Sequence, residues 1–400
     1  MARTPPHLIT IILLTAFSPL SLNMFLPSLG HIAEDLQTDY ALVSVAIAGY
    51  LATTAVIQLI AGPLADRFGR RPVLLVALVI FCISSFVCAM AENIWVFLFF
   101  RMLQGSITAG YTLSMAIVRD THPPQQAAGL IGYISMCMAI APMLGPVFGG
   151  LLDTAFGWRS NFYLYATCGV LILALCWVDL GETRPERQES DQPMTRAILA
   201  LIQDPRFCAY AVCSTFTVGA FYIFLAGAPL VATTSFGVTT AELGFLIGSI
   251  TVGFSAGGFL AGKFSSRISL PAMMLIGRLT ACTGLSIGLL VFLVGGSSPF
   301  AFFAGTIFVG IGNGITMPGS NTGAMSVRPD LAGSAAGLVG ALALAGGAAL
   351  TSLAGIAVGT GDQPVTVLAL MLASSAVGLA AAFAALLLER SAGTGPQASH

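Results

Sequence analysis

Long apolar segments, each separated from the next by a short polar stretch, repeat along the whole chain. Their lengths are near or above the roughly 20 residues that an α-helix needs to cross a lipid bilayer. The pattern predicts an all-α membrane protein with twelve transmembrane helices. We expect these helices at residues 8–27, 42–63, 72–91, 94–118, 128–152, 161–180, 207–232, 241–262, 271–294, 299–322, 331–355 and 365–388.

Composition agrees with this pattern. Of the 400 residues, 56% are hydrophobic and only 8% are charged, whereas roughly 25% of the residues of soluble domains are charged. The first apolar run is too long for a cleaved signal peptide, lacks a small-residue cleavage site and is followed by eleven more runs. All eight cysteines fall in apolar segments without CxxC spacing. They are expected to be small core residues rather than disulfides or metal ligands, and no cofactor is expected.

The chain is expected to consist of two related halves. Residues 181–206 are rich in charge and proline, which predicts a cytoplasmic linker between six-helix bundles at 1–180 and 207–400. A shared frame of Val-Arg, an acid and AAGL(I/V)G occurs at 118–132 and again at 327–340. Because each half contains six spans, the repeat is parallel, an arrangement typical of transporters that carry a central site and rock their halves around it.

The basic residues predict the orientation, because Lys and Arg near helix ends stay on the cytoplasmic side. With the N-terminus inside, most of the sixteen Lys and Arg fall on inner segments, and only Arg159 lies on an outer one. Both termini are therefore expected in the cytoplasm. Lys263 is the one lysine in the chain, and glycine and alanine are abundant, which hints at a GC-rich bacterial genome and hence a bacterial inner (plasma) membrane.

The turn between the second and third spans reads GPLADRFGRRPVLL. Asp66 is expected at the C-terminal end of a helix, where the helix dipole disfavours an anion, so it should find a positive partner. Candidates are Arg119 and the N-terminus of span eleven near Leu331, and either would act as a latch that closes the cytoplasmic side. An ordinary basic turn explains the arginines but not the spacing of Gly62, Asp66 and Gly69.

Span five contains APMLGPVFGGLL, in which glycines clear one strip of the helix and Pro146 bends it. Such a strip can approach a partner helix closely, and Gly253 and Gly257 of span eight have the matching four-residue interval. The alternative is a tight helix crossing without mechanistic meaning. The candidate gating residues are Gly62, Asp66, Arg67, Gly69, Arg70, Arg119, Asp120, Gly145, Pro146, Gly149 and Gly150.

These motifs resemble those of the major facilitator superfamily. The turn is similar to its G-x-x-x-D-R-x-G-R-R pattern, FRMLQGSITAG in span four to its R-x-x-Q-G motif, and APMLGPVFGGLL to the span-five motif of its antiporters. NMFLPSL, IVRD, GWRSNFYL and LGET resemble the Bcr/CflA-type drug:proton antiporters. The resemblance implies two pseudo-symmetric six-helix bundles. It also implies efflux of small amphipathic compounds, as in bicyclomycin and chloramphenicol resistance, driven by proton entry.

A charged residue inside a membrane span is a functional candidate by default. Arg101 lies roughly 10 Å below the outer face and Asn23 roughly 22 Å above the inner face, so in a core of about 30 Å their depths nearly coincide. If spans one and four are neighbours, as the family fold implies, Asn23 can offer its amide oxygen to Arg101. Arg278 lies near the cytoplasmic end of span nine, where it can snorkel to water, and is assigned no role.

Three hypotheses address which residue carries the proton. The resistance subfamily usually has an aspartate at the position of Asn23, and no acid of this chain is predicted at mid-membrane, although coupling needs a group that titrates near neutral pH. One hypothesis places the titrating group at a rim. In a second, Arg101 anchors an anionic or carbonyl-bearing substrate, and in a third, export is uncoupled. The rim candidates are His31, Glu34, Asp35 and Asp120.

Span four also carries a polar stripe at helical spacing, Gln104, Thr108 and Thr112, which faces either the cavity or a neighbouring helix. The cavity should combine apolar and aromatic residues with a few amides and hydroxyls. The substrate-binding candidates are Asn23, Tyr50, Thr54, Arg101, Gln104, Thr108, Met136, Phe216, Tyr222, Phe224, Asn313, Met317 and Asn321.

The predicted function is export of small molecules, with protons and the lipid bilayer as the other partners. The alternative is a dedicated exporter of one metabolite, such as an amino acid or sugar. No mid-membrane Ser/His/Asp set, HExxH motif or Cys/His cluster occurs, so an enzyme is not expected. No nucleic-acid partner is expected either, and the chain is predicted to be a monomer.

Overall fold

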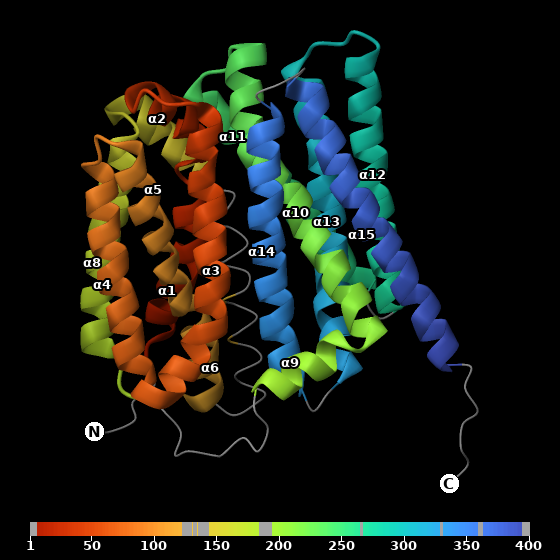
Figure 1. The fold of residues 1–400 in the computed structure, drawn as a ribbon, viewed down its shortest axis with the longest axis horizontal. Coiled ribbons are helices and arrows are strands. Elements are labelled where there is room, and N and C mark those ends of the chain that lie inside the picture. The colour runs from red at the N-terminus through yellow and green to blue at the C-terminus, as the bar shows by residue number, and fades with distance from the viewer. Residues whose placement is uncertain are drawn as a thin grey trace. The chain divides into compact units, whose positions relative to one another are not determined.

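The structure is a computed structural model, and it describes residues 6–121, 130, 134, 144–183, 194–264, 267–328, 331–358 and 363–393. Within this part the regular elements are helices (Figure 1). Ten of the described helical segments are long and apolar enough to cross a membrane, and a shorter apolar helix covers Leu144–Phe156. The all-α membrane class predicted from the apolar pattern is therefore confirmed.

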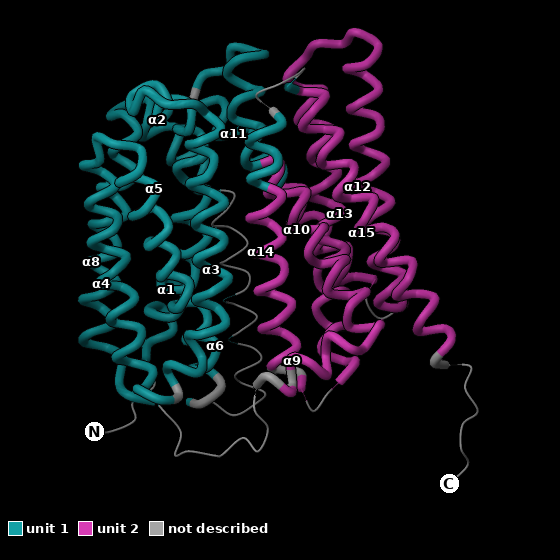
Figure 2. The backbone as a smooth tube through the Cα atoms, in the orientation of Figure 1, with its two compact units in different colours: residues 1–189, 225–251, 351–363 teal, residues 190–224, 252–350, 364–400 magenta. Residues whose placement is uncertain are grey.

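The chain forms two compact units (Figure 2). Unit 1 comprises residues 1–189, 225–251 and 351–363, and unit 2 comprises residues 190–224, 252–350 and 364–400. The predicted bundle boundaries stay a prediction. In the first part of the chain the helices are α1 (Leu8–Asn23), α2 (Leu29–Asp35), α3 (Tyr40–Phe68), α4 (Arg70–Ala89), α5 (Ile94–Leu103), α6 (Thr108–Thr121) and α8 (Arg159–Asp179). These are followed by α9 (Met194–Ile202), α10 (Pro205–Leu230), α11 (Thr240–Phe264), α12 (Leu270–Leu293), α13 (Pro299–Val327), α14 (Ala332–Val358) and α15 (Gln363–Gly393).

Two of the predicted spans are interrupted where the sequence suggested a single helix. Span one does not end at Pro27, because a 3₁₀ turn at Leu26–Ser28 joins α1 to α2. Proline fits the first turn of a helix, where its missing N–H is not needed. Span four is divided by a 3₁₀ turn at Gln104–Ile107, directly after the buried Arg101. Most of predicted span five, 128–152, lies outside the described residues.

The core of unit 1 contains a cluster of aromatic rings from α1, α4 and α8. Phe17 meets Phe81 edge-on at 5.4 Å and Tyr165 at 6.4 Å, and Tyr165 meets Phe162 at 5.5 Å. Edge-to-face pairs of this kind add about 0.5–1.5 kcal/mol each beyond the area that they bury. The cluster fixes α1 against α8, and these are two of the helices that surround Arg101.

In unit 2, the backbones of α12 and α13 approach closely through glycine. A Cβ on Gly277 would lie 2.5 Å from the carbonyl oxygen of Gly312, and a Cβ on Gly312 would lie 2.4 Å from that of Gly277. Small residues allow such contacts where helices cannot rely on a hydrophobic driving force. The crossing brings Arg278, the residue after Gly277, against α13.

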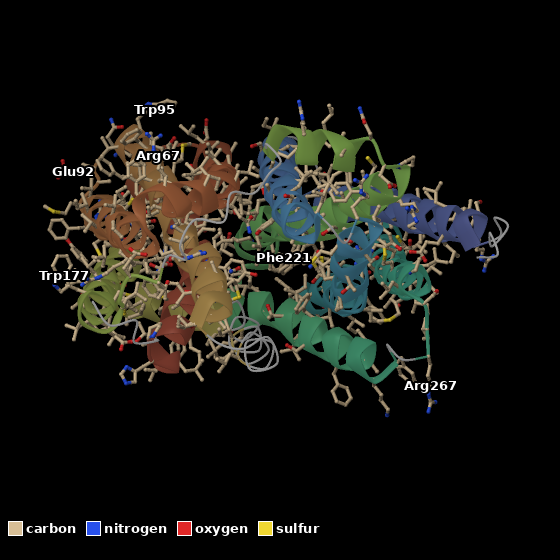
Figure 3. The ribbon with its side chains drawn as sticks, turned by 90° about the horizontal axis from the view of Figure 1, so that it is seen from below. Arg67, Glu92, Trp95, Trp177, Phe221 and Arg267 are labelled. Atoms are coloured by element: carbon tan, nitrogen blue, oxygen red, sulfur yellow. The ribbon has the colours of Figure 1, made fainter. Side chains whose placement is uncertain are left out.

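Helix α9 was not predicted. It lies across the end of α10 rather than alongside it (Figure 1), with Leu201 buried in the core of unit 2 and Leu199 and Ile202 exposed. On unit 1, Trp95 and Trp177 project from the rim (Figure 3) and are 66% and 63% exposed. Exposed tryptophans at helix ends are typical of the two membrane–water interfaces.

Candidate functional site

Arg101 lies in the interior of unit 1 and is fully buried. Its Nη1 donates to Gln104 Oε1 at 2.5 Å, across the start of the 3₁₀ turn, and its Nη2 donates to the carbonyl oxygen of Ser21 in α1 at 3.0 Å. The guanidinium also lies over two rings, with Cζ 4.1 Å from the centroid of Phe25 and 4.5 Å from that of Tyr50. Span one and span four are therefore neighbours at this depth, as predicted.

A chain of polar side chains extends from this arginine through the bundle. Gln104 Nε2 donates to Ser85 Oγ of α4 at 2.8 Å, and the hydroxyl groups of Ser21 and Tyr50 lie 2.9 Å apart. Further along, Thr108 Oγ1 lies 3.2 Å from the Ser18 hydroxyl and donates to Thr54 Oγ1 at 3.4 Å. The structure thus brings together five of the predicted substrate-binding residues: Tyr50, Thr54, Arg101, Gln104 and Thr108.

No carboxylate bonds to Arg101 among the residues that the structure describes. A buried guanidinium without an anion is costly to desolvate, and here amide, carbonyl and ring π-electron partners offset part of that cost. The Nε of Arg101 has no hydrogen-bond partner in the described part of the chain. The N–H of Nε in this fully buried cation therefore lacks an acceptor among the described residues.

Asn23 does not make the predicted bond. Its Nδ2 donates to the carbonyl oxygen of Pro19, one turn earlier in α1, at 2.7 Å, while Arg101 reaches Ser21 instead. Asn side chains compete for nearby backbone groups in this way. The Asn23 side chain is buried, and its Oδ1 has no partner within the described residues. The expectation that Asn23 would bond Arg101 was wrong, because the acceptor is Ser21, two residues earlier in α1.

Unit 2 contains a second fully buried arginine, Arg278. It donates from Nη2 to Asn313 Oδ1 at 2.6 Å and from Nε to Thr316 Oγ1 at 3.0 Å, both on α13. Asn313 Nδ2 in turn donates to the carbonyl oxygen of Thr217 in α10 at 3.1 Å. The prediction that Arg278 snorkels to water is wrong, because the glycine crossing beside it turns its side chain toward α13. The three-residue spacing of Asn313 and Thr316 was the signal that could have revealed this partner.

The other candidates in unit 2 are mostly packing residues. Tyr222 packs where Gly347 leaves room for its ring, Phe224 meets Phe303 edge-on at 6.0 Å, and Met317 Sδ accepts a hydrogen bond from Ser214 at 3.8 Å. Phe216 is half-buried and Asn321 is exposed, whereas Met136 lies outside the described residues.

The glycine strip of span five packs against α1. A Cβ on Gly149 would lie 1.6 Å from the carbonyl oxygen of Met24, and one on Gly145 would lie 3.3 Å from the Met24 nitrogen. The proposed partners in span eight are engaged elsewhere, because Gly253 and Gly257 face the backbone of α13 in unit 2. The predicted pairing of span five with Gly253 and Gly257 was therefore wrong, since a four-residue glycine interval does not identify its partner.

The turn between α3 and α4 is held by Glu182, which was not among the predicted site residues. Glu182 accepts from the backbone nitrogens of Arg70 at 2.9 Å and Arg71 at 3.3 Å, and so caps the N-terminus of α4. Gly69 has φ of +98°, and a Cβ there would lie 2.4 Å from Glu182 Oε2. The side chains of the proposed latch, Asp66, Arg119 and Asp120, are outside the described residues, so the latch stays a prediction. The LGET motif was the signal for Glu182.

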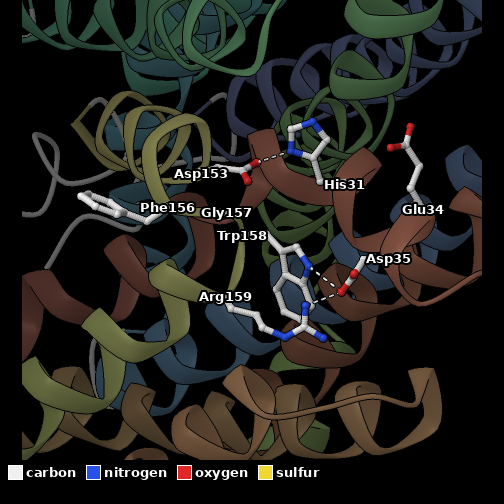
Figure 4. A pocket seen from close by; sticks show the side chains of 8 residues that line it. All are labelled: His31, Glu34, Asp35, Asp153, Phe156, Gly157, Trp158 and Arg159. Carbon is white, nitrogen blue, oxygen red and sulfur yellow. Dashed lines mark hydrogen bonds and ion pairs between the residues drawn. The ribbon is translucent and has the colours of Figure 1, made fainter.

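Three of the proton-coupling candidates lie around one pocket of about 620 Å³ in unit 1 (Figure 4). His31 Nδ1 lies 2.9 Å from Asp153 Oδ2, Asp35 forms an ion pair with Arg159, and Glu34 is exposed. Asp153 was not among the predicted candidates for proton coupling. Its position four residues after Gly149 places it on the glycine face of the helix.

Comparison with known proteins assigns the chain to a family. Residues 11–352 match the family model described as Major Facilitator Superfamily. The chain is 31% identical over 351 residues to the uncharacterized MFS-type transporter YdgK of Bacillus subtilis (strain 168), with 86% of this chain and 87% of that protein covered. It is 32% identical over 314 residues to the multidrug resistance protein MdtL of Escherichia coli (strain UMN026), with 72% and 79% covered.

Two solved structures resemble its fold. A bacterial homologue of the human lysosomal transporter Spinster, in an inward-facing and occupied conformation, aligns with a TM-score of 0.74 at 17% identity over 96% of each chain. A D-xylose-proton symporter aligns with a TM-score of 0.74 at 16% identity, over 94% of this chain and 96% of that one. The predicted fold is confirmed, and the chain belongs to the major facilitator superfamily, whose members are membrane transporters rather than enzymes.

Proposed function

We propose that this transporter exports small amphipathic compounds, drugs among them, from the cytoplasm in exchange for protons. The observation that carries the proposal is the buried polar network around Arg101. A charged side chain inside a membrane span is costly, so its presence indicates a functional site. The name of the MdtL relative, a multidrug resistance protein, supports the substrate class.

The chemistry of the network suggests how it would act. Arg101 keeps an unpaired donor at Nε and has aromatic neighbours in Phe25 and Tyr50. A carbonyl or anionic group of a substrate can accept from that donor while its apolar body packs on the rings, which is the usual division of labour in a small-molecule site. In unit 2, Arg278 also keeps a buried Nη1 without a partner among the described residues, so each unit offers a cationic donor.

We further propose that the chain works by alternating access as a monomer in a bacterial inner membrane, with both termini in the cytoplasm. The bias of basic residues toward predicted inner segments supports this orientation. A fusion of alkaline phosphatase to the C-terminus tests it directly. The fusion should be inactive, because alkaline phosphatase folds to its active form only outside the cytoplasm, and an active fusion would reverse the orientation.

Breadth of substrate is tested by growth. Cells that express the chain should tolerate raised concentrations of several compounds in a panel of a dozen unrelated antibiotics and dyes, and cells that express Arg101→Ala should not. Protection against one compound or none would favour the alternative, a dedicated exporter of one metabolite.

Coupling is tested by uptake into inverted membrane vesicles with and without an imposed pH gradient, for the parent, Asn23→Asp and Arg101→Ala. The parent should lose most of its uptake when the gradient is collapsed. Unchanged uptake would eliminate proton coupling, and full uptake by Arg101→Ala would remove this arginine from the mechanism.

A further inference from the structure

The pocket of Figure 4 contains a pair of titratable side chains that the network around Arg101 does not use. His31 on α2 and Asp153 on the helix Leu144–Phe156 are joined at 2.9 Å, and both line the pocket. His31 and Asp153 lie 122 residues apart in the sequence. The contact therefore connects span one to span five.

Asp153 is unusual in how it is buried. Its side chain is 1% exposed, Oδ2 faces His31, and Oδ1 is buried without a hydrogen-bond partner among the described residues. A buried carboxylate with an unsatisfied oxygen is costly as an anion, and a proton on the pair removes part of that cost. The His31 side chain is 50% exposed, so it connects this carboxylate with solvent in the pocket.

The other charged groups around the pocket are already balanced or face solvent. Asp35 forms an ion pair with Arg159 and accepts from Trp158 Nε1 at 3.1 Å, and Arg159 also donates to the carbonyl oxygen of Ala91 at 3.0 Å. Glu34 is exposed on α2. Among the described residues, His31 is therefore the group that can place a positive charge against Asp153. Histidine is also the side chain that ordinarily exchanges its proton between pH 5 and 8.

The pair is mechanically connected to the site around Arg101. Gly145, Gly149 and Asp153 are spaced four residues apart, so they share one face of span five. The two glycines of that face pack directly on the backbone of Met24, the C-cap of α1, and Asp153 meets His31 on α2. A shift of span five against α1 therefore moves Met24. Met24 lies three residues from Ser21, whose carbonyl oxygen accepts a hydrogen bond from Arg101.

We propose that His31 and Asp153 together form the proton-binding site of the antiport. Asp153 is the buried proton acceptor, and His31 is the residue through which the proton passes between the pocket and Asp153. This inference rests on the proposed function, and with the N-terminus inside it places the pair on the side from which protons enter. The proton passes from solvent to the His31 ring and is shared with the Asp153 carboxylate. Binding it changes how firmly α2 is held to span five.

The test compares transport rates with and without an inward pH gradient in proteoliposomes, with the compound best tolerated in the growth panel as the probe. Asp153→Asn removes the acceptor, and His31→Gln keeps a hydrogen-bond donor that cannot titrate. For both variants the ratio of the two rates should fall to about one, while the parent and Glu92→Gln, an exposed acid outside the pocket, keep the parent's ratio. Size-exclusion profiles and melting temperatures establish that each variant is folded.

The outcomes separate this inference from the proposed function. A parent that responds to the gradient together with variants that respond equally would overturn the pair as the proton site and leave antiport standing. Loss of the response in Glu34→Gln but not in Asp153→Asn would assign the proton to Glu34 instead. A parent whose rate ignores the gradient would refute proton antiport itself, and the role of the pair with it.

Discussion

Substitution of Gly149 by alanine gives a quantitative test of the contact between span five and α1. The added Cβ would lie 1.6 Å from the carbonyl oxygen of Met24, about 1.8 Å short of the 3.4 Å at which ordinary contact begins. Both sides of this contact are backbone, so no side chain can rotate away and the helices must separate. Overpacking costs about 1–3 kcal/mol, and we expect the upper end of that range here. The better helix propensity of alanine returns about 1 kcal/mol, which leaves a net loss of about 2 kcal/mol.

Gly145 provides a matched control one turn earlier on the same face. A Cβ there would lie 3.3 Å from the Met24 nitrogen and 3.4 Å from Asn23 Cβ, a contact that shifts of a few tenths of an ångström relieve. Thermal unfolding of the purified chain in detergent is the assay. Gly149→Ala should lower the melting temperature by about 2–3 °C, whereas Gly145→Ala, which has the same gain in helix propensity without a comparable clash, should not lower it. Equal melting temperatures for the two variants would refute the close approach of span five to α1.

Three further predictions concern other contacts. Gly257→Ala should destabilise the chain, since its Cβ would lie 2.1 Å from the carbonyl oxygen of Ile311, whereas Gly258→Ala meets nothing within 4 Å and should not; equal thermal stability of these neighbours would contradict the α11–α13 packing. Glu182→Ala removes the cap of α4 and should cost about 0.5–2 kcal/mol in the free energy of unfolding, measured by thermal unfolding; no loss would mean that the cap is dispensable. Arg101→Lys should lose the paired donation from Nη1 and Nη2, which should lower the free energy of unfolding by about 1–3 kcal/mol. The variant should also lose resistance in the growth panel, and full resistance would show that a point charge suffices.

The sequence predicted the helices well because the length and apolarity of a span are set by the bilayer. Of the predicted spans, 42–63 appears as α3, 72–91 as α4 and 271–294 as α12, each within five residues at either end. Helix α9 was missed because it crosses no membrane, so its apolar residues are too few to form a span.

The site was predicted less completely, for physical reasons that differ between residues. The rise per residue of a helix gives the depth of a side chain in the membrane, and on this basis Arg101 was correctly placed next to span one. It does not give the rotation of α1 about its axis. Asn23 was therefore predicted as the acceptor, whereas Ser21 supplies it. The burial of Arg278 depends on a glycine crossing with another helix, and no local pattern reports such a crossing. Asp153 was not identified from the sequence, since its partner His31 is 122 residues away.

We propose that export of the compound and entry of the proton are one process. Proteoliposomes that contain the purified chain and an internal pH indicator dye test it, when an exported compound is added on the side from which the chain takes it up. Proton antiport predicts a change in internal pH that begins with transport of the compound, because protons move in the opposite direction, and that is absent for Arg101→Ala. Transport of the compound without any change in internal pH would contradict it.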